Sequence, residues 1–552
     1  MANKHLRFWP SHLPHKLTVP EIPVCENLLI SAKRYPHKTA IIFYEANITY
    51  SQLLNESGRL ATYLNRNCQI KKGDRVILDL QNSPQFVIAY YGIMLAGGIV
   101  VPINPMSVTG ELEHYCKDSG ATTAIASLDV LSQFEPLLDL SLKNLIVTSY
   151  DDYLPQSSIT KLPDSMQKKS ASLNLDQIVE WNEIKSTTDG HINSGLKSSD
   201  IAAILYTSGT TGKPKGCTHT HGTLMQTLVG AAMWENMHQD SVSLSSAPMF
   251  HVTGMQHSLN AVLYTGSTMV ILPRWDPKLA SLMIEEHQCT HWANVPTMVV
   301  DLLADKSTES RDLSSLKVIF GGGSAMPQSV AEDLFAKCGV KYMEGYGMTE
   351  TISQTHMNPP IDLRKQCLGI PTFGTEAIII DPDNLTPLGS NKMGEILVHG
   401  PQIMQGYWGN PKANSEVFVS IESKKFLRTG DLGYADEDGF FYIADRLKRM
   451  INCAGFKVWP AEVESILYKN PKIKEVAIIS SPHERRGETV KAVISLKDKF
   501  PNTTDKEIIS WSKQNMAAYK VPKLVSFMSS LPKSGTGKIQ WRLLQEKEWE
   551  GK

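Results

Sequence analysis

The chemically richest stretch of the sequence is Tyr206-Thr-Ser-Gly-Thr-Thr-Gly-Lys-Pro-Lys-Gly216, which follows the apolar run Ile201–Leu205. Its eleven residues include three glycines and four Ser or Thr hydroxyls. Backbone without side chains can approach an anion closely, and hydroxyls and lysines such as Lys215 donate hydrogen bonds to phosphate oxygens. The composition therefore predicts a phosphate-binding loop at the end of a strand.

This loop does not fit the P-loop pattern. A P-loop needs a glycine five positions before the glycine of its Gly-Lys pair, and a Ser or Thr after the lysine. Thr207 and Pro214 occupy those two places here. The later segment Ser534–Lys538 fails the same test because Pro532 stands where the first glycine should be. A P-loop kinase or ATPase is therefore the weaker interpretation.

Six further segments follow the loop in a fixed order: Pro248-Met-Phe-His251, Gly321-Gly-Gly-Ser324, Gly345-Tyr-Gly-Met-Thr-Glu350, Arg428-Thr-Gly-Asp431, Asp445-Arg-Leu-Lys448 and Leu531-Pro-Lys-Ser-Gly-Thr-Gly-Lys538. Together with the loop, this set resembles the adenylate-forming superfamily of acyl-CoA synthetases, adenylation domains and firefly-type luciferases. Upstream, Phe8-Trp9-Pro10 and Gln81-Asn-Ser-Pro84 are similar to bacterial medium- and long-chain fatty acyl-CoA ligases. The resemblance covers essentially the whole chain.

The resemblance implies an enzyme, a fatty acid–CoA ligase (AMP-forming). Such a ligase joins a carboxylate to the α-phosphate of ATP, expels pyrophosphate and then passes the acyl group to coenzyme A. Two anions must meet in this reaction, so the site needs fixed positive charge and oriented hydrogen-bond donors. ATP, Mg²⁺ and coenzyme A are the cofactors that the resemblance implies.

The resemblance also assigns nucleotide-binding roles. The β- and γ-phosphates are expected to bind the loop residues Thr207, Ser208, Gly209, Thr210, Thr211 and Lys215. Adenine is expected between Gly322, Gly323 and Ser324 on one face and Tyr346 on the other. Asp431 is similar to the carboxylate that accepts both ribose hydroxyls, and Arg446 to a second nucleotide contact near ribose and phosphate.

The catalytic residues that the resemblance implies are Lys538, Thr349, Glu350 and His251. Lys538 is expected to bridge the substrate carboxylate and the α-phosphate from the tip of a Gly-rich turn. Thr349 is expected to bind the α-phosphate and Glu350 to bind Mg²⁺, which prefers oxygen ligands. Both follow Gly345-Tyr-Gly347, which we expect to be a flexible turn.

The resemblance further implies a moving C-terminal domain. Lys448 matches the hinge about which the small domain turns between half-reactions. Hinges absorb a large backbone change at few positions. Gly455 is similar to the glycine that faces the coenzyme A channel, where a side chain would obstruct pantetheine.

His251 resembles the residue between ATP and the acyl pocket. The pocket walls are expected from Trp292–Met298, Gly321–Gly323 and Tyr346–Met348, with His251, Trp292, Asn294, Gly321, Gly347 and Met348 as the named candidates. Acetate-activating relatives carry Trp at the position of Gly347, so its missing side chain favours a medium or long acyl chain. An aryl-CoA or other carboxylic-acid–CoA ligase is the alternative, because a ring needs the same space.

Other classes are weaker. Luciferase-type oxygenation is disfavoured because those relatives carry Lys where this chain has Asn452. Free coenzyme A is a simpler acceptor than a carrier protein, since no carrier or condensation domain is visible. A nucleotide-binding protein without catalysis conflicts with the presence of Lys538, Glu350 and Asp431. His219 and His221 are read as polar residues beginning a helix, not as a metal site.

The elements that must position these residues alternate. Strands are predicted at Arg75–Leu80, Ile99–Ile103 and Thr122–Ala126, with helices at Pro84–Leu95 and Glu111–Asp118. This alternation predicts βαβ units and a largely parallel sheet covered by helices. The polar stretch Asp151–Ser199 is expected to be an irregular connection. The fold expected from the superfamily is a large α/β N-terminal domain with parallel or mixed sheets and a small mobile α+β C-terminal domain.

Charge marks the boundary between the two domains. Residues 446–552 contain 21 Lys or Arg and 11 Asp or Glu, a net charge of +10, whereas the remainder contains 34 and 45, a net of −11. We expect residues 1–445 to bind AMP and the acyl group, and residues 446–552 to form a cap that carries Lys538. Such a cap suits a polyanion such as a nucleotide.

Composition limits the partners. The 552 residues are 42% hydrophobic and 20% charged, as in globular chains, and the net charge of −1 gives no footprint for nucleic acid. The uncharged run Phe86–Ile103 is interrupted by glycines and a proline, so we expect a buried helix and strand and no integral membrane segment. The scattered eight cysteines and the absence of an apolar leader favour a reducing, cytoplasmic compartment. Peripheral membrane contact and a monomeric or homodimeric state remain open.

Overall fold

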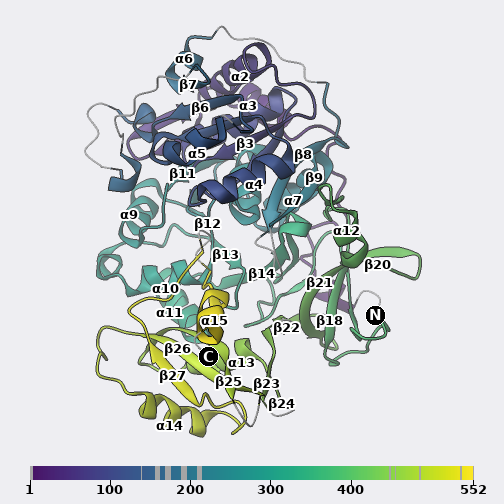
Figure 1. The fold of residues 1–552 in the computed structure, drawn as a ribbon, viewed down its shortest axis with the longest axis vertical. Helices are drawn as coiled ribbons and strands as arrows, with labels where there is room; N and C mark the ends of the chain where they lie inside the picture. The colour runs from purple at the N-terminus through teal and green to yellow at the C-terminus, as the bar shows by residue number, and fades with distance from the viewer. Residues whose placement is uncertain are drawn as a thin grey trace.

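The computed structural model describes residues 4–138, 140–155, 162–167, 176–187, 195–207, 214–446, 449–453, 456–483, 487–534 and 538–550. These residues form a large N-terminal domain on three sheets and a small C-terminal domain on a fourth. Figure 1 shows the C-terminal domain in yellow tones beneath α10 (Pro296–Ala304). The predicted α/β architecture with a small second domain is therefore confirmed.

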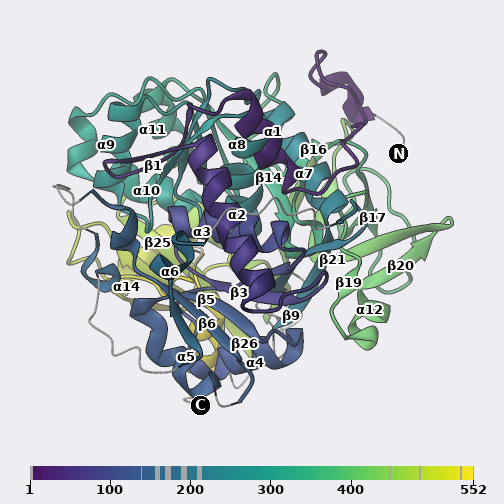
Figure 2. The same ribbon diagram turned by 90° about the horizontal axis from the view of Figure 1, so that it is seen from above.

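The first sheet has eight strands in the order β19-β9-β8-β4-β3-β5-β6-β7. Neighbours from β8 to β7 are parallel, whereas β9 runs antiparallel to both β8 and β19. The strands are β3 (Arg75–Asp79), β4 (Ile99–Pro102), β5 (Thr123–Ser127), β6 (Asn144–Thr148), β7 (Ile178–Glu180), β8 (Ile201–Thr207), β9 (Lys215–Thr220) and β19 (Gly406–Tyr407). The associated helices are α2 (Tyr50–Arg66), α3 (Pro84–Leu95), α4 (Thr109–Ser119), α5 (Leu131–Leu138) and α6 (Trp181–Lys185). Figure 2 shows α2 running over α3, against which it packs.

The second sheet has nine strands in the order β16-β15-β14-β13-β12-β10-β11-β1-β2. Its strands are β1 (Thr39–Phe43), β2 (Ala46–Thr49), β10 (Val242–Ser245), β11 (Thr268–Ile271), β12 (His291–Asn294), β13 (Val318–Gly322), β14 (Tyr342–Met348), β15 (Ser353–Met357) and β16 (Ile370–Pro371). Its helices are α1 (Glu26–Arg34), α7 (His221–Trp234), the π-helix η5 (Gly254–Asn260), α8 (Ala261–Thr265), α9 (Pro277–His287), α10 and α11 (Gln328–Cys338).

Two five-stranded sheets complete the described fold. The first contains β17 (Glu376–Ile380), β18 (Gly394–His399), β20 (Phe418–Ile421), β21 (Lys424–Ala435) and β22 (Phe441–Arg446), with α12 (Pro411–Val417) beside it. The C-terminal sheet contains β23 (Ile451–Cys453), β24 (Phe456–Val458), β25 (Ile473–His483), β26 (Gly487–Leu496) and β27 (Leu524–Phe527). Its helices are α13 (Pro460–Leu467), α14 (Asp505–Asn515) and α15 (Trp541–Glu550).

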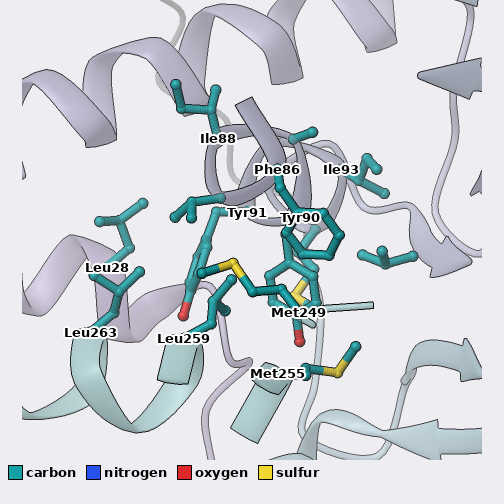
Figure 3. Packing of buried hydrophobic residues seen from close by; sticks show 14 of the residues in the cluster. Leu28, Phe86, Ile88, Tyr90, Tyr91, Ile93, Met249, Met255, Leu259 and Leu263 are labelled. Atoms are coloured by element: carbon teal, nitrogen blue, oxygen red, sulfur yellow. The ribbon is translucent and has the colours of Figure 1, made fainter. Parts of the chain in front are cut away.

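Helix α3 forms the centre of the largest apolar core. Ser83 caps it, accepting a hydrogen bond from Phe86 N at 3.2 Å, and Pro84 occupies its first turn. All of its residues are buried, because it lies in a core to which both large sheets contribute. Figure 3 shows Tyr90 and Tyr91 of α3 pointing toward Met249 and Leu259. The predicted buried helix followed by a buried strand is confirmed by α3 and β4.

Across the described ranges, no helix combines the length and apolar character that a membrane span requires.

Asn82 joins the two large sheets at the point where β3 and β10 end. Its Nδ2 donates to Ala247 O at 3.0 Å and its Oδ1 accepts from Met249 N at 2.8 Å. The side chain is 3% exposed, so both hydrogen bonds are shielded from water. The segment that leads to His251 is thereby fixed to the loop that starts α3.

Two local predictions are wrong. Within the stretch expected to be irregular, β7 pairs in parallel with β6 and α6 follows it, because Ile178, Trp181 and Ile184 are buried anchors in an otherwise polar segment. The expected flexible turn Gly345–Gly347 is part of β14 instead. Gly345 pairs with both β13 and β15, and Tyr346 and Gly347 pair with β15, which overrides the turn preference of glycine.

Glu344, on β14, is a half-buried carboxyl in this sheet. It accepts hydrogen bonds from Gln366 N at 2.8 Å and Met326 N at 3.3 Å, tying two loops to the strand. Burial nevertheless raises the pKa of Glu344 to about 7, although both donors oppose the rise. Ionisation of this group therefore opposes folding.

We predict that Glu344→Gln weakens the pH dependence of stability. A carboxyl with a raised folded-state pKa contributes stability that is complete below about 4.5 and is lost as the pH rises through about 7. The loss is at most about 3 kcal/mol. The apparent Tm should therefore fall less between pH 5 and pH 8 in Glu344→Gln than in the unmodified chain.

Glu416→Gln is the matched control, because Glu416 lies at an exposed position of α12. It should keep the original pH dependence. An equal fall in Tm for Glu344→Gln and the unmodified chain would contradict the role assigned to this carboxyl.

Candidate active site

The hairpin of β8 and β9 holds the ends of the predicted phosphate loop. Thr207 lies opposite Lys215 in this ladder. The Lys215 ammonium lies 4.3 Å from the centre of the Tyr407 ring, and the Tyr407 hydroxyl donates to Glu350 Oε1 at 2.8 Å. Burial and the Glu350 carboxylate raise the pKa of Tyr407, so the phenol keeps its proton. One aromatic ring thus connects the cation of the loop with the predicted magnesium ligand.

Thr349 and Glu350 form the short helix η7 (Thr349–Thr351) between β14 and β15. His219 Nε2 donates to Thr349 O at 2.7 Å, since a carbonyl oxygen can only accept. Burial lowers the pKa of His219 to about 4, so the ring is neutral. On the next residue, Met404 N donates to Glu350 O at 2.9 Å. The backbone of both candidate ligands is therefore held by side-chain and main-chain donors.

Asp431 and Tyr346 meet at the predicted ribose and adenine position. The Tyr346 hydroxyl donates to Asp431 Oδ2 at 2.6 Å, and Asp431 is 2% exposed. In the β21–β22 ladder, the Cα of Arg446 lies opposite that of Asp431. Gly322 lies opposite Gly345, and a Cβ built on Gly322 would press against Gly345 O. The two glycines let β13 and β14 approach closely beside Tyr346.

Lys538 reaches this same edge of the sheet from the C-terminal domain. A Cβ built on Gly323 would lie 2.9 Å from Lys538 Nζ, and Gly323 has φ +87°. Burial, with the Lys538 ammonium as the second cause, lowers the pKa of His251 to about 3. The structure therefore brings Lys538, Gly323 and His251 together, with the imidazole neutral at physiological pH.

Contacts on the C-terminal domain hold Lys538 in place. Ser534 N donates to Lys538 O at 2.8 Å and Lys538 N donates to Ser534 Oγ at 3.3 Å. Lys533 Nζ lies 2.8 Å from Oε1 of Glu475 in its own domain. It also lies 3.7 Å from Oδ2 of Asp301 on α10, which belongs to the N-terminal domain. The orientation of the C-terminal domain thus brings its lysine to the N-terminal domain.

The predicted acyl-pocket residues fall into two groups. Trp292 and Asn294 are fully buried, with Trp292 Nε1 donating to Ser246 Oγ at 2.9 Å and Asn294 Oδ1 accepting from Tyr342 OH at 3.1 Å. Gly347 and Met348 instead pair with β15.

The Cβ position of Gly347 is blocked by the carbonyl of Ser353. The missing side chain at residue 347 therefore allows β15 to approach in this structure. The space beside that residue is occupied by backbone. Gly321 is similarly close to neighbouring backbone, because a Cβ there would press against Asn294 O.

A family model described as "AMP-binding enzyme" matches residues 29–408, and one described as "AMP-binding enzyme C-terminal domain" matches residues 462–538. The chain belongs to the AMP-binding enzyme family. Among curated relatives, a long-chain-fatty-acid–CoA ligase of Bacillus subtilis (strain 168) is 36% identical, with 98% of this chain and 97% of the relative covered. A feruloyl-CoA synthase of Amycolatopsis sp is 31% identical, with 92% and 95% covered.

Solved structures of the family share the fold over nearly the whole chain. The anthranilate CoA ligase AuaEII in complex with anthranoyl-AMP has a TM-score of 0.84 at 26% identity, covering 98% of both chains. ATP-bound MatB from Rhodopseudomonas palustris has a TM-score of 0.81 at 26% identity, covering 95% of this chain and 99% of that one.

Several predicted residues of this AMP-binding enzyme lie outside the described residues: Ser208, Gly209, Thr210 and Thr211 of the loop, the hinge candidate Lys448 and the channel candidate Gly455. Ser324 is described and exposed, next to Gly323. Of the histidine pair, His221 begins α7 as expected, whereas His219 lies on β9 and holds Thr349.

Tyr407 was not found from the sequence. It stands in Gly406-Tyr-Trp-Gly409, an aromatic pair between glycines, but nothing in the spacing connects it with Lys215 or Glu350. The connection arises because β19 adds to β9, which joins segments far apart in the chain. An aromatic residue between glycines is the single signal that the sequence offers for such a contact.

We predict that Gly323→Ala impairs acyl-adenylate formation by displacing Lys538. The added methyl group would occupy the space of the lysine side chain, and misplacing a catalytic group by about 1 Å can slow a reaction roughly a hundredfold. Acid-dependent exchange of pyrophosphate with ATP measures this half-reaction.

Gly73→Ala is the control for backbone strain, because Gly73 also has φ +87° and its Cβ would meet nothing within 4 Å. Both variants carry the same conformational penalty. If both slow the exchange equally, steric contact with Lys538 is not the cause.

Proposed function

We propose that this AMP-binding enzyme is an ATP-dependent acid–thiol ligase that activates a medium- or long-chain fatty acid as acyl-AMP and transfers it to coenzyme A. The observation that carries the proposal is the approach of Lys538 to Gly323 and His251, beside Tyr346 and Asp431. The 36% identity to a long-chain-fatty-acid–CoA ligase over nearly the full chain supports the substrate class.

The proposed reaction begins with ATP held by the loop after β8. Lys215 and the loop hydroxyls bind the β- and γ-phosphates, Thr349 binds the α-phosphate, and Asp431 accepts the ribose hydroxyls. Lys538 neutralises the charge that builds between the acid carboxylate and the α-phosphate as pyrophosphate leaves. His251 stays neutral beside it, because its pKa of about 3 prevents a second cation from forming there.

Mg²⁺ fits Glu350 by donor chemistry. Oxygen ligands suit this ion, which takes one or two protein carboxylates and completes its shell with phosphates and water. In the described part of the chain, no group of three or more His, Cys, Asp or Glu could hold a metal alone. When bound, Mg²⁺ would supply charge neutralisation at the phosphates, and Tyr407 would orient Glu350 through its hydroxyl.

We further propose the domain division at residues 445 and 446, with Lys448 as hinge and Gly455 facing the coenzyme A channel. A rotation there would withdraw Lys538 after adenylation and open a path for the thiol. The modest ion pair of Lys533 with Asp301 at 3.7 Å is easily broken, which supports such movement.

We place the enzyme in the cytoplasm. All eight cysteines are free thiols in the structure, which supports a reducing compartment.

An aryl-CoA ligase is the second candidate. The feruloyl-CoA synthase relative and the structural neighbour bound to anthranoyl-AMP favour it. Exchange of pyrophosphate with ATP, measured across saturated acids of about four to eighteen carbons and with benzoate and cinnamate, separates the candidates. Fastest exchange with eight or more carbons supports the fatty acid, and no exchange with any acid would refute the ligase.

We predict that Lys538→Ala slows adenylation by roughly two to three orders of magnitude, because the charge of the transition state loses its cation. Thioester formation from pre-made acyl-AMP should largely survive. Both half-reactions are measured separately, by pyrophosphate exchange and by acyl-CoA release.

Lys547→Ala provides a control in the same domain, since Lys547 is an exposed residue of α15. It should leave both half-reactions unchanged. Equal losses in the two half-reactions of Lys538→Ala would refute the role of the lysine.

A further inference from the structure

Three buried polar side chains form a continuous hydrogen-bonded chain near the candidate acyl pocket. His257 Nδ1 lies 2.5 Å from Glu235 Oε1, and His257 Nε2 lies 3.1 Å from Ser353 Oγ. The side chains of His257 and Glu235 are 2% and 0% exposed. Glu235 caps the C-terminal end of α7, His257 belongs to η5 and Ser353 begins β15, so three separate elements contribute to the chain.

The direction of each hydrogen bond follows from the position of the proton on the ring. We assign that proton to His257 Nδ1, which then donates to the carboxyl oxygen Glu235 Oε1. Nε2 is then the bare nitrogen, and the Ser353 hydroxyl must donate to it. The hydroxyl hydrogen is therefore used, and Ser353 Oγ offers its lone pairs alone to any further partner.

This arrangement costs free energy, through strained backbone and through the desolvation of buried polar groups. Ser353 has φ +111° and Ile352 has φ +45°, both unusual for residues with side chains. η5 is a π-helix, a rare geometry that is frequently found at functional sites. Among described atoms, Glu235 Oε2 is buried without a hydrogen-bond partner. Backbone strain and buried polar groups of this kind occur together where a site must be held in one arrangement.

The polar chain lies on the acid side of the candidate site. The Cα of Ser353 pairs with that of Met348, which precedes Thr349. The His257 ring lies 4.5 Å, centroid to centroid, from the ring of Phe320, which precedes Gly321. A Cβ on Gly347, a candidate pocket residue, would press against Ser353 O. Ser353 therefore lies beside Gly347 and Met348, two of the candidate acyl-pocket residues.

We propose that Ser353, oriented by His257 and Glu235, binds a hydrogen-bond donor carried by the far end of the acid, namely a hydroxyl group. This deepens the proposed ligase function and rests on it. Ser353 offers an acceptor, so a hydroxyl satisfies it, whereas a methyl group or a methyl ether at the same place does not. His257 and Glu235 are positioning residues in this proposal, because they act on the acid through Ser353.

The test compares acids that differ in this group alone. The probes are 4-hydroxy-, 4-methoxy- and unsubstituted 3-phenylpropenoic acid, with 8-hydroxyoctanoic and octanoic acid as the aliphatic pair. We expect kcat/KM for pyrophosphate exchange to be at least about tenfold higher for the hydroxylated member of one of these sets, because an unmatched buried acceptor is costly. Equal or lower values for the hydroxylated acid in both sets would overturn the proposal.

Variants separate recognition from structure. Ser353→Gly removes the hydroxyl and suits the positive φ, so the relief of backbone strain offsets the lost hydrogen bond to His257 Nε2 and its Tm should stay close to that of the unmodified chain. Its preference for the hydroxylated acid should nevertheless disappear, mainly through KM. Retention of the full preference in Ser353→Gly would refute recognition by Ser353.

Ser258→Ala is the matched control. Ser258 is a fully buried residue of the same π-helix, and its hydroxyl takes no part in the Glu235–His257–Ser353 chain. It should keep the preference for the hydroxylated acid. Loss of the preference in Ser258→Ala as well as Ser353→Gly would show that repacking of η5 is responsible, and would count against the proposal.

The two proposals fail in different ways. Absence of exchange with every acid in the unmodified chain would refute the ligase function and this inference with it. Exchange with all acids at similar kcat/KM would refute the recognition of a hydroxyl group alone and leave the ligase function intact.

Discussion

The position of one ammonium group, that of Lys538, constrains the whole site. The lysine comes from the basic C-terminal domain and lies against Gly323 of the acidic N-terminal domain. Its charge helps to keep His251 neutral, so a single cation stands at the place where we propose that the two anions meet. A fixed second cation would hold the acid and ATP equally well before and during reaction, and would not favour the transition state. A lysine on a separate domain can be supplied for one step and withdrawn for the next.

Bare backbone gives the other side of the site its shape. Gly322 and Gly345 lie opposite each other, and Gly347 lies against the carbonyl of Ser353. These contacts bring β13, β14 and β15 close together and fix Tyr346, Thr349 and Glu350 along one edge. The depth of the proposed acid site therefore depends on where β15 lies as much as on the missing side chain at residue 347. This links the strained backbone at Ser353 to the site.

The sequence alone predicts features that depend on neighbouring residues, on a periodic pattern or on the order of known motifs. The cap at Ser83 with Pro84 and the uninterrupted apolar run were sufficient for α3, and the ordered motifs were sufficient for the family. Gly345–Gly347 was wrongly expected to be a turn, since a ladder on both sides outweighs glycine propensity. The contacts of Lys538 with Gly323 and of Tyr407 with Glu350 could not be predicted, because each depends on how distant segments pack. The roles of Lys448 and Gly455 stay predictions.

The Glu235–His257–Ser353 chain beside the proposed acyl pocket would act mainly by disfavouring acids with an apolar group at that place. An apolar group pressed against Ser353 Oγ would strip water from an acceptor without replacing the hydrogen bond, and such a loss costs more than one matched bond gains. In this proposal Glu235 accepts from His257 Nδ1, so the Ser353 hydroxyl donates to Nε2 and does not turn its hydrogen toward the acid. Apolar contacts from the core around α3 hold η5 in place and give no such selection, because methylene groups of similar size pack there almost equally well. The proposed selectivity at the far end of the acid therefore depends on one oxygen, Ser353 Oγ, which is held by three elements that the apolar core keeps in place.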